Sequence, residues 1–91
     1  MADRCVRALI RGTVQNVGFR YATYHEATAL GARGYVRNLP GQLVEAVFEG
    51  DDATLERALA FVRQGPPLAR VTGVEVESIS YQGFSDFEIR E

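Results

Sequence analysis

The chain has 91 residues, of which 46% are hydrophobic and 24% charged, and its formal net charge is −2. This length predicts a single domain over residues 1–91, and the balance of residue types is typical of a globular protein rather than a disordered or fibrous one. A general nucleic-acid binder would usually be basic, and a membrane helix would need about 20 consecutive apolar residues, which the sequence does not contain.

The scarce residue types narrow the function classes further. The sequence has one cysteine, Cys5, and one histidine, His25, so it predicts neither an internal disulfide nor a Cys/His zinc site. The start of the chain has no apolar signal core, and together with the single cysteine this favours a cytoplasmic protein. All ten basic residues are arginine, a bias that base composition or heat adaptation explains better than function.

The first third of the chain predicts a strand, a loop and a helix. Residues 5–11 alternate apolar and polar, as a half-buried strand does, and a loop with glycine at both ends follows over 12–18. From 19 to about 30 the apolar period lengthens to that of a helix, and Gly31 is a natural helix stop. The residues expected to share the apolar face of this helix are Phe19, Ala22, Ala29 and Leu30.

A hairpin and a second helix come next. Residues 34–39 and 43–49 read as two strands joined by a turn at Pro40-Gly41. Asp51 and Asp52 then offer caps for a helix that ends at residues 65–67. Its amphipathic stripe is the clearest in the sequence and consists of Leu55, Ala58, Leu59 and Val62.

The order of elements predicts an α+β fold. Residues 71–79 form a further strand, and Phe87 and Ile89 a short terminal one. A helical crossover makes the first two strands parallel, and the hairpin places the third strand between them. The result is a ferredoxin-like (split βαβ) two-layer sandwich, βαββαβ plus a short C-terminal strand. Both helices are expected to cover one face of the sheet, and the other face is expected to be partly exposed to solvent. This exposure would explain the charged strand residues Arg7, Arg11, Glu45, Glu49, Glu75 and Glu77.

The loop from Gly12 to Arg20 carries the most chemical information. It leads from a strand into a helix start, where the first N–H groups lack partners within the helix and carry the positive end of its dipole. Gly18 lets the backbone approach a ligand, and Arg20, in the first helical turn, can add a bidentate contact to a phosphate. The segment therefore predicts an anion site, with an ordinary turn beside a surface arginine as the alternative.

Asn38 lies near the end of the second strand. Because the first and second strands run parallel, Asn38 and the loop emerge at the same edge of the sheet, separated by two strand spacings or roughly 10 Å. That separation suits a phosphate together with an attacking water. The alternative is that Asn38 only bonds its own backbone in the turn before Pro40.

Two segments of the sequence resemble the signatures of the acylphosphatase family. The first is GTVQNVGFR at residues 12–20, and the second is GYVRNLP at residues 34–40 followed by Val44 and Glu45. Both occur at the family's spacing, and the resemblance covers nearly the whole chain. It continues through residues 48–50, 65–71 and 84–90.

The resemblance implies an enzyme that hydrolyses the carboxyl–phosphate bond of small acyl phosphates without a metal or other cofactor, with inorganic phosphate as a product. Arg20 matches the family's catalytic, phosphate-binding arginine, and Asn38 matches the asparagine that orients the nucleophilic water. The backbone that matches the phosphate cradle belongs to Gln15, Asn16, Val17, Gly18 and Phe19. We further expect a monomer that binds neither nucleic acid nor a membrane.

Two positions depart from the family pattern. Asn16 stands where the family normally has glycine, and asparagine is the least costly replacement if the backbone there needs a positive φ. Gly41-Gln42 replaces the usual Asp-Gly in the hairpin, which we expect to alter the turn type more than the chemistry.

Two other functions fit the same fold. A non-catalytic module could bind phosphate within a larger assembly, but a chain that carries both Arg20 and Asn38 argues against it. An RNA-binding domain would need aromatic residues on a central strand, where the sequence offers only Phe48 in a core-facing position. His25 is expected at the surface of the first helix rather than as a base. Cys5 is expected to be a passive thiol, with an intermolecular disulfide on oxidation as the alternative.

Overall fold

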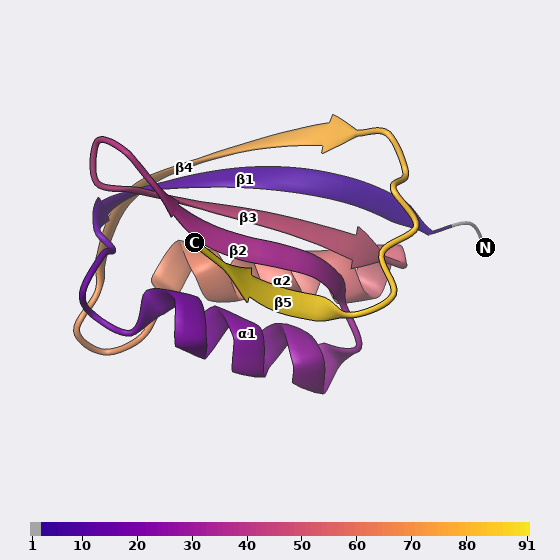
Figure 1. The fold of residues 1–91 in the computed structure, drawn as a ribbon, viewed down its shortest axis with the longest axis horizontal. Coiled ribbons are helices and arrows are strands. Elements are labelled where there is room, and N and C mark those ends of the chain that lie inside the picture. The colour runs from indigo at the N-terminus through magenta and orange to yellow at the C-terminus, as the bar shows by residue number, and fades with distance from the viewer. Residues whose placement is uncertain (1–2) are drawn as a thin grey trace.

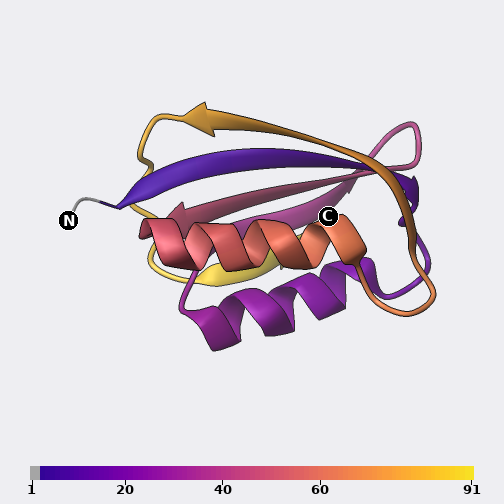
Figure 2. The same ribbon diagram turned by 180° about the vertical axis from the view of Figure 1, so that it is seen from behind.

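The computed structural model describes residues 3–91, and its sheet has five strands in the order β4-β1-β3-β2-β5. Both helices lie on one face of this sheet, as the two opposite views show (Figures 1 and 2). The predicted α+β ferredoxin-like sandwich is therefore confirmed. The elements in chain order are β1 Arg4–Thr13, α1 Phe19–Leu30, β2 Arg33–Leu39, β3 Leu43–Gly50, α2 Asp52–Gln64, β4 Arg70–Ile79 and β5 Phe87–Arg90.

The strand pairings follow the predicted topology. The third strand, β3, pairs antiparallel with both β1 and β2, so β1 and β2 run in the same direction. The short β5 pairs parallel with the outer side of β2, which the sequence did not predict. This pairing brings the last residues of β5 to the end of the sheet where β1 and β2 both finish (Figure 1).

The helices bury their apolar stripes against the sheet. On α2 the predicted stripe is confirmed, with Leu55, Ala58 and Val62 buried, and Asp51 accepts the capping hydrogen bond from Thr54 N at 2.8 Å. On α1 the expected face is partly wrong. Its buried residues are Phe19, Thr23 and Ala27, spaced by four, whereas Ala29 is exposed, because the i, i+4 row through Phe19 faces the core.

The hairpin between β2 and β3 turns through two residues with positive φ, Gly41 at 86° and Gln42 at 62°. Such values are usual in tight hairpin turns, although a glutamine there is strained. Among the described residues, no helix is long and apolar enough to span a bilayer.

The prediction that the second face of the sheet is exposed to solvent is wrong for two of its glutamates. Glu45 is 2% exposed and Glu49 is fully buried, whereas Arg11, Glu75 and Glu77 are exposed as expected. Arg7 Nε donates to one carboxylate oxygen of Glu45 and Arg37 Nε donates to the other. Burial alone raises the pKa of Glu45, but these two arginines outweigh it and hold the pKa below its usual value.

Glu49 is buried for a different reason, because the connection between β4 and β5 folds over it. Its carboxylate accepts backbone N–H groups from Gln82 at 2.7 Å, Gly83 at 3.2 Å and Phe84 at 2.8 Å. Although burial raises the pKa of Glu49, these amides and the Cys5 thiol bring it below its usual value. The carboxylate thus ties β5 to the sheet.

The Cys5 thiol is 1% exposed and adjoins Glu49. Burial, and then the neighbouring Glu49, raise the pKa of Cys5 to about 11, which keeps the thiol protonated. A buried and protonated thiol supports the passive role and argues against an intermolecular disulfide in the folded protein.

We expect Glu49→Gln to lower the free energy of unfolding by about 2–3 kcal/mol at pH 7, because three backbone amides lose a charged acceptor. The pKa of Glu49 is depressed in the folded state, so its contribution is complete above the ordinary value of 4.5 and is lost as the pH falls through the folded pKa. Urea denaturation between about pH 7 and pH 3 should therefore show a smaller loss of stability with acid for Glu49→Gln than for wild type. The exposed Glu75→Gln is the matched control; equal stability of Glu49→Gln and Glu75→Gln at pH 7 would contradict the role of Glu49.

Candidate active site

The loop between β1 and α1 leaves the sheet at a position that only glycine fits. The register of β1 against β4 shifts between Arg11 and Gly12, and Gly12 has a φ of 126°. A Cβ atom on Gly12 would lie 2.0 Å from the carbonyl oxygen of Arg70. The close approach of the two backbones at this bulge fixes the direction in which the loop departs.

The loop itself curls through two residues with positive φ. Asn16 has a φ of 63° and Gly18 a φ of 77°, so the condition under which asparagine is the least costly replacement for glycine at residue 16 is met. Asparagine tolerates this region at a lower cost than other non-glycine residues. The Asn16 substitution is thus compatible with the loop's backbone path.

The start of α1 has no cap. Gly18 stands at the N-cap without a side-chain hydrogen bond, and the first turn holds no acidic residue, whereas α2 has Asp51 and Asp52. The first bond of α1 runs from Ala22 N to Gly18 O at 3.0 Å, so the N–H groups of Phe19, Arg20 and Tyr21 precede it. Of the hydrogen bonds described for residues 3–91, none is donated by a backbone N–H of residues 15–18. Free N–H donors at the start of a helix favour the binding of an anion.

A cavity of about 270 Å³ lies where this loop, the start of α1 and the ends of β2 and β5 meet. Its lining residues are Val14, Asn16, Gly18, Phe19, Arg20, Tyr21, Asn38 and Ile89. Five of the seven predicted site residues are thus brought together. The volume is close to the lower end of the range for small-molecule sites, about 300–1,000 Å³.

Gln15 and Val17 do not line the cavity. The Gln15 side chain donates two hydrogen bonds to the hairpin, to Leu39 O at 2.8 Å and to Leu43 O at 2.9 Å. Val17 packs against the hydrophobic core. Their side chains fix the loop to the rest of the fold, and Gln15 in particular ties it to the strand that carries Asn38.

The Arg20 side chain reaches across to β5, where its Nη1 donates to the carbonyl oxygen of Arg90 at 3.3 Å. A guanidinium has five N–H donors, so this single bond leaves the others available to a ligand. Arg20 is therefore held at the cavity without being saturated.

The Asn38 side chain offers an unused acceptor. Its Oδ1 atom is buried and has no hydrogen-bond partner among the described residues. Buried polar atoms in proteins are nearly always paired with protein or water, so an unpaired one beside a cavity indicates a polar occupant. A water that donates to Oδ1 would fit this position.

The sequence did not predict three of the residues that line the cavity, Val14, Tyr21 and Ile89. Tyr21 directly follows Arg20 in the first helical turn, so its place beside a predicted site residue could have identified it as a lining residue. Ile89 could not be placed, because its position depends on the pairing of β5 with β2.

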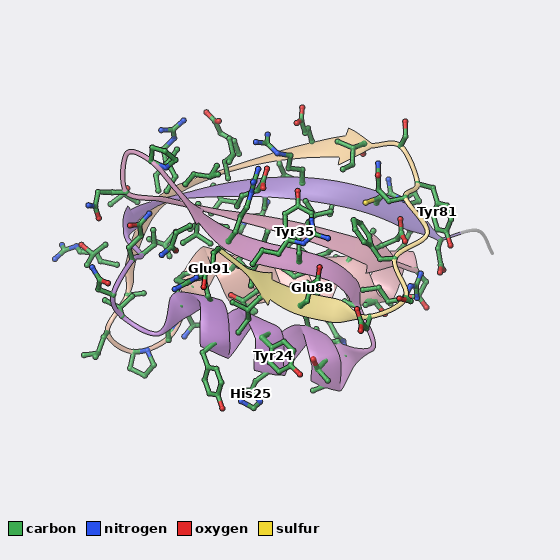
Figure 3. All side chains as sticks on the ribbon, viewed as in Figure 1. Tyr24, His25, Tyr35, Tyr81, Glu88 and Glu91 are labelled. Atoms are coloured by element: carbon green, nitrogen blue, oxygen red, sulfur yellow. The ribbon has the colours of Figure 1, made fainter. Side chains whose placement is uncertain are left out.

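Other candidates for chemistry lie apart from the cavity. His25 is exposed, as predicted, and points away from the sheet (Figure 3). Within residues 3–91 there is no group of three or more His, Cys, Asp or Glu side chains that could hold a metal ion. Phe48, the aromatic residue of the central strand β3, is 1% exposed and stacks on Phe87 at a centroid distance of 5.6 Å.

The fold and the cavity together define a ferredoxin-like domain with a polar cavity between its first loop and its second strand. The family model for acylphosphatases matches residues 6–89. An acylphosphatase of Thermococcus kodakarensis is 50% identical over 86 residues, covering 92% of this chain and 94% of the relative. The chain belongs to the acylphosphatase family, whose members are hydrolases of acyl phosphates.

Solved structures agree with this assignment. The acylphosphatase of Coxiella burnetii superposes with a TM-score of 0.93 at 33% identity, covering 97% of this chain and 93% of that one. The HypF protein of T. kodakarensis superposes with a TM-score of 0.85, also at 33% identity, covering 97% of this chain and 12% of that chain. The same fold therefore also occurs as a small part of a longer protein.

We expect Asn16→Gly to hydrolyse benzoyl phosphate with a turnover equal to or higher than that of wild type, because glycine adopts a φ of 63° without strain. Asn16→Val is the contrasting variant: a β-branched residue resists this conformation, so kcat/KM should fall about tenfold or more. Steady-state kinetics on both variants tests this. A complete loss of turnover in Asn16→Gly would instead assign a chemical role to the Asn16 amide.

Proposed function

We propose that the chain hydrolyses the carboxyl–phosphate bond of small acyl phosphates, with the phosphoryl group bound in the cavity between Arg20 and Asn38. The observation that carries the proposal is the convergence, on one cavity, of the uncapped start of α1, the Arg20 side chain and the unpaired Oδ1 of Asn38. Each of these supplies a different requirement of phosphoryl transfer.

The phosphoryl oxygens are bound by positive groups that are already in place. Backbone N–H groups of residues 15–19 and the Arg20 guanidinium neutralise the charge of the phosphate and of the transition state. Because the donors are fixed by Gly12, Gln15 and the helix, little reorganisation is needed when the reaction occurs. No metal ion or other cofactor enters this mechanism.

The nucleophile is a water positioned by Asn38. An O–H of this water donates to Asn38 Oδ1, which leaves an oxygen lone pair directed at phosphorus. The new P–O bond forms as the bond between phosphorus and the acyl oxygen breaks. The products are a carboxylate and inorganic phosphate, and one proton of the water is released to phosphate or solvent.

We also propose that the chain acts as a monomer in the cytoplasm and without nucleic acid. One chain supplies all eight lining residues of the cavity. The burial of Phe48 leaves the central strand β3 without the exposed aromatic platform that RNA-binding domains use. Size-exclusion chromatography with light scattering would measure the oligomeric state directly.

Arg20→Ala should lower kcat/KM for benzoyl phosphate by about 10²–10³, with both the affinity for phosphate and the turnover reduced, because one guanidinium binds ground state and transition state alike. Arg63→Ala, which removes an exposed arginine at the end of α2, is the matched control and should retain full activity. Binding of inorganic phosphate by wild type without any hydrolysis would instead favour the non-catalytic module.

Asn38→Ala should reduce turnover by about 10- to 100-fold while the inhibition constant of inorganic phosphate stays close to that of wild type, because only the water loses its partner. Steady-state rates and phosphate inhibition, measured on the same preparation, separate the two quantities. Wild-type turnover in Asn38→Ala would show that the water is positioned by another group.

A further inference from the structure

The Arg20 side chain depends on a backbone carbonyl at the weakest edge of the sheet. Within residues 3–91, the Arg20 guanidinium donates one hydrogen bond, from Nη1 to Arg90 O at 3.3 Å. Arg90 is the last residue of β5. The pairing of β5 with β2 spans only four residue pairs, from Gly34–Phe87 to Arg37–Arg90. The position of the Arg20 guanidinium is thus set by how firmly the end of β5 is held.

The last pair of this ladder is unfavourable by itself. Arg37 and Arg90 lie directly opposite each other, and like charges in that relation repel. Arg37 has a strong partner, because its Nε donates to the buried Glu45 at 2.6 Å. Among residues 3–91, the salt-bridge partner of Arg90 is the exposed Glu88, two residues earlier on the same strand, at 2.7 Å. A further attractive contact is therefore needed to offset the repulsion between Arg90 and Arg37.

The aromatic ring of Tyr35 fills this role. The guanidinium carbon of Arg90 lies 4.1 Å from the ring centroid, well within the range of a cation–π contact, and that of Arg37 lies 5.8 Å away. The Tyr35 ring is itself packed edge-on against Phe84, with a centroid distance of 5.9 Å. Figure 3 shows Tyr35 on β2 beside Glu88 on β5, to which it is paired in the sheet.

We infer that Tyr35, which does not line the cavity, is a positioning residue for catalysis: its ring holds the side chain of Arg90, and the carbonyl of Arg90 holds the Arg20 guanidinium at the phosphate site. Tyr35 lies on the sheet face opposite the helices, with Arg37, and makes no contact with the cavity. An arginine that is held in place before substrate binds loses less side-chain entropy on binding. This inference rests on the proposed role of Arg20.

The test compares Tyr35→Leu, which removes the ring, with Tyr35→Phe, which keeps it. Tyr35→Leu should lower kcat/KM for benzoyl phosphate and weaken inhibition by inorganic phosphate, each by about fivefold. Tyr35→Phe should restore both to within about twofold of wild type, because the face of the ring binds the guanidinium without the hydroxyl. Thermal unfolding of each variant, measured in parallel, records any change in stability.

A double-mutant cycle distinguishes positioning from general damage. In an Arg20→Ala background, Tyr35→Leu should produce no further loss of kcat/KM, because the guanidinium it would position is gone. Arg90→Leu should reproduce the Tyr35→Leu phenotype, and the Tyr35→Leu, Arg90→Leu double variant should be no worse than either single one. Arg90→Leu also keeps the inference testable if Tyr35→Leu does not fold.

Three results would overturn the inference: wild-type kinetics in Tyr35→Leu, an equal loss from Tyr35→Leu with or without Arg20, or a loss in Tyr35→Phe as large as that in Tyr35→Leu. These are distinct from failure of the proposed function. That failure would appear as a wild-type protein that hydrolyses no acyl phosphate, or as an Arg20→Ala variant with full activity.

Discussion

The N–H groups at the start of α1 are the constraint around which the rest of the molecule is arranged. A helix of this length normally satisfies its first turn with a capping side chain, as α2 does with Asp51. In α1 the N-cap is Gly18, and the preceding loop is bent by Asn16 and tethered by Gln15 so that further N–H groups lie beside the same helix end. An uncapped helix start lowers stability, and an anion that binds there recovers that stability. The feature that weakens the fold locally is therefore the same one that leaves N–H donors free at the candidate site.

The two faces of the sheet serve this site in different ways. Asn38 lies on the face covered by the helices. Because β1 and β2 run in the same direction, Asn38 and the loop after β1 lie at the same end of the sheet. The opposite face carries two buried carboxylates, each of which organises positive or donating groups around it. Glu45 fixes Arg7 and Arg37, and Glu49 fixes the connection that leads into β5. The last residue of β5 accepts the hydrogen bond from Arg20 through Arg90 O, so the polar contacts of the opposite face are linked through β5 to the Arg20 side chain.

Local patterns predicted local structure, and long-range contacts explain what the sequence analysis missed. Alternation located the strands, and the stripe on α2 located its buried face. The suitability of Asn16 for a positive φ could also be argued from the sequence, because that tolerance is a property of the residue itself. The burial of Glu45 and Glu49 was not predicted, because it depends on distant parts of the chain. Arg7 lies 38 residues from Glu45, and the amide of Gln82 lies 33 residues from Glu49. Since β5 has only four residues, its sequence does not specify which strand it joins, so Ile89 and Arg90 could not be assigned to the site.

The side chains around the cavity also bear on which bond can be broken there. They are carboxamides, one guanidinium, apolar groups and the phenol of Tyr21. An alkyl phosphate must expel an alkoxide, which needs a proton from an acid with a pKa near neutrality. An acyl phosphate expels a carboxylate, which is stable without a proton at neutral pH. Imidazole is a common proton donor in enzymes, but His25, the one histidine of the sequence, lies on the outward side of α1 (Figure 3). A site that binds and neutralises the phosphoryl group and orients a water is therefore sufficient for an acyl phosphate and insufficient for an ester.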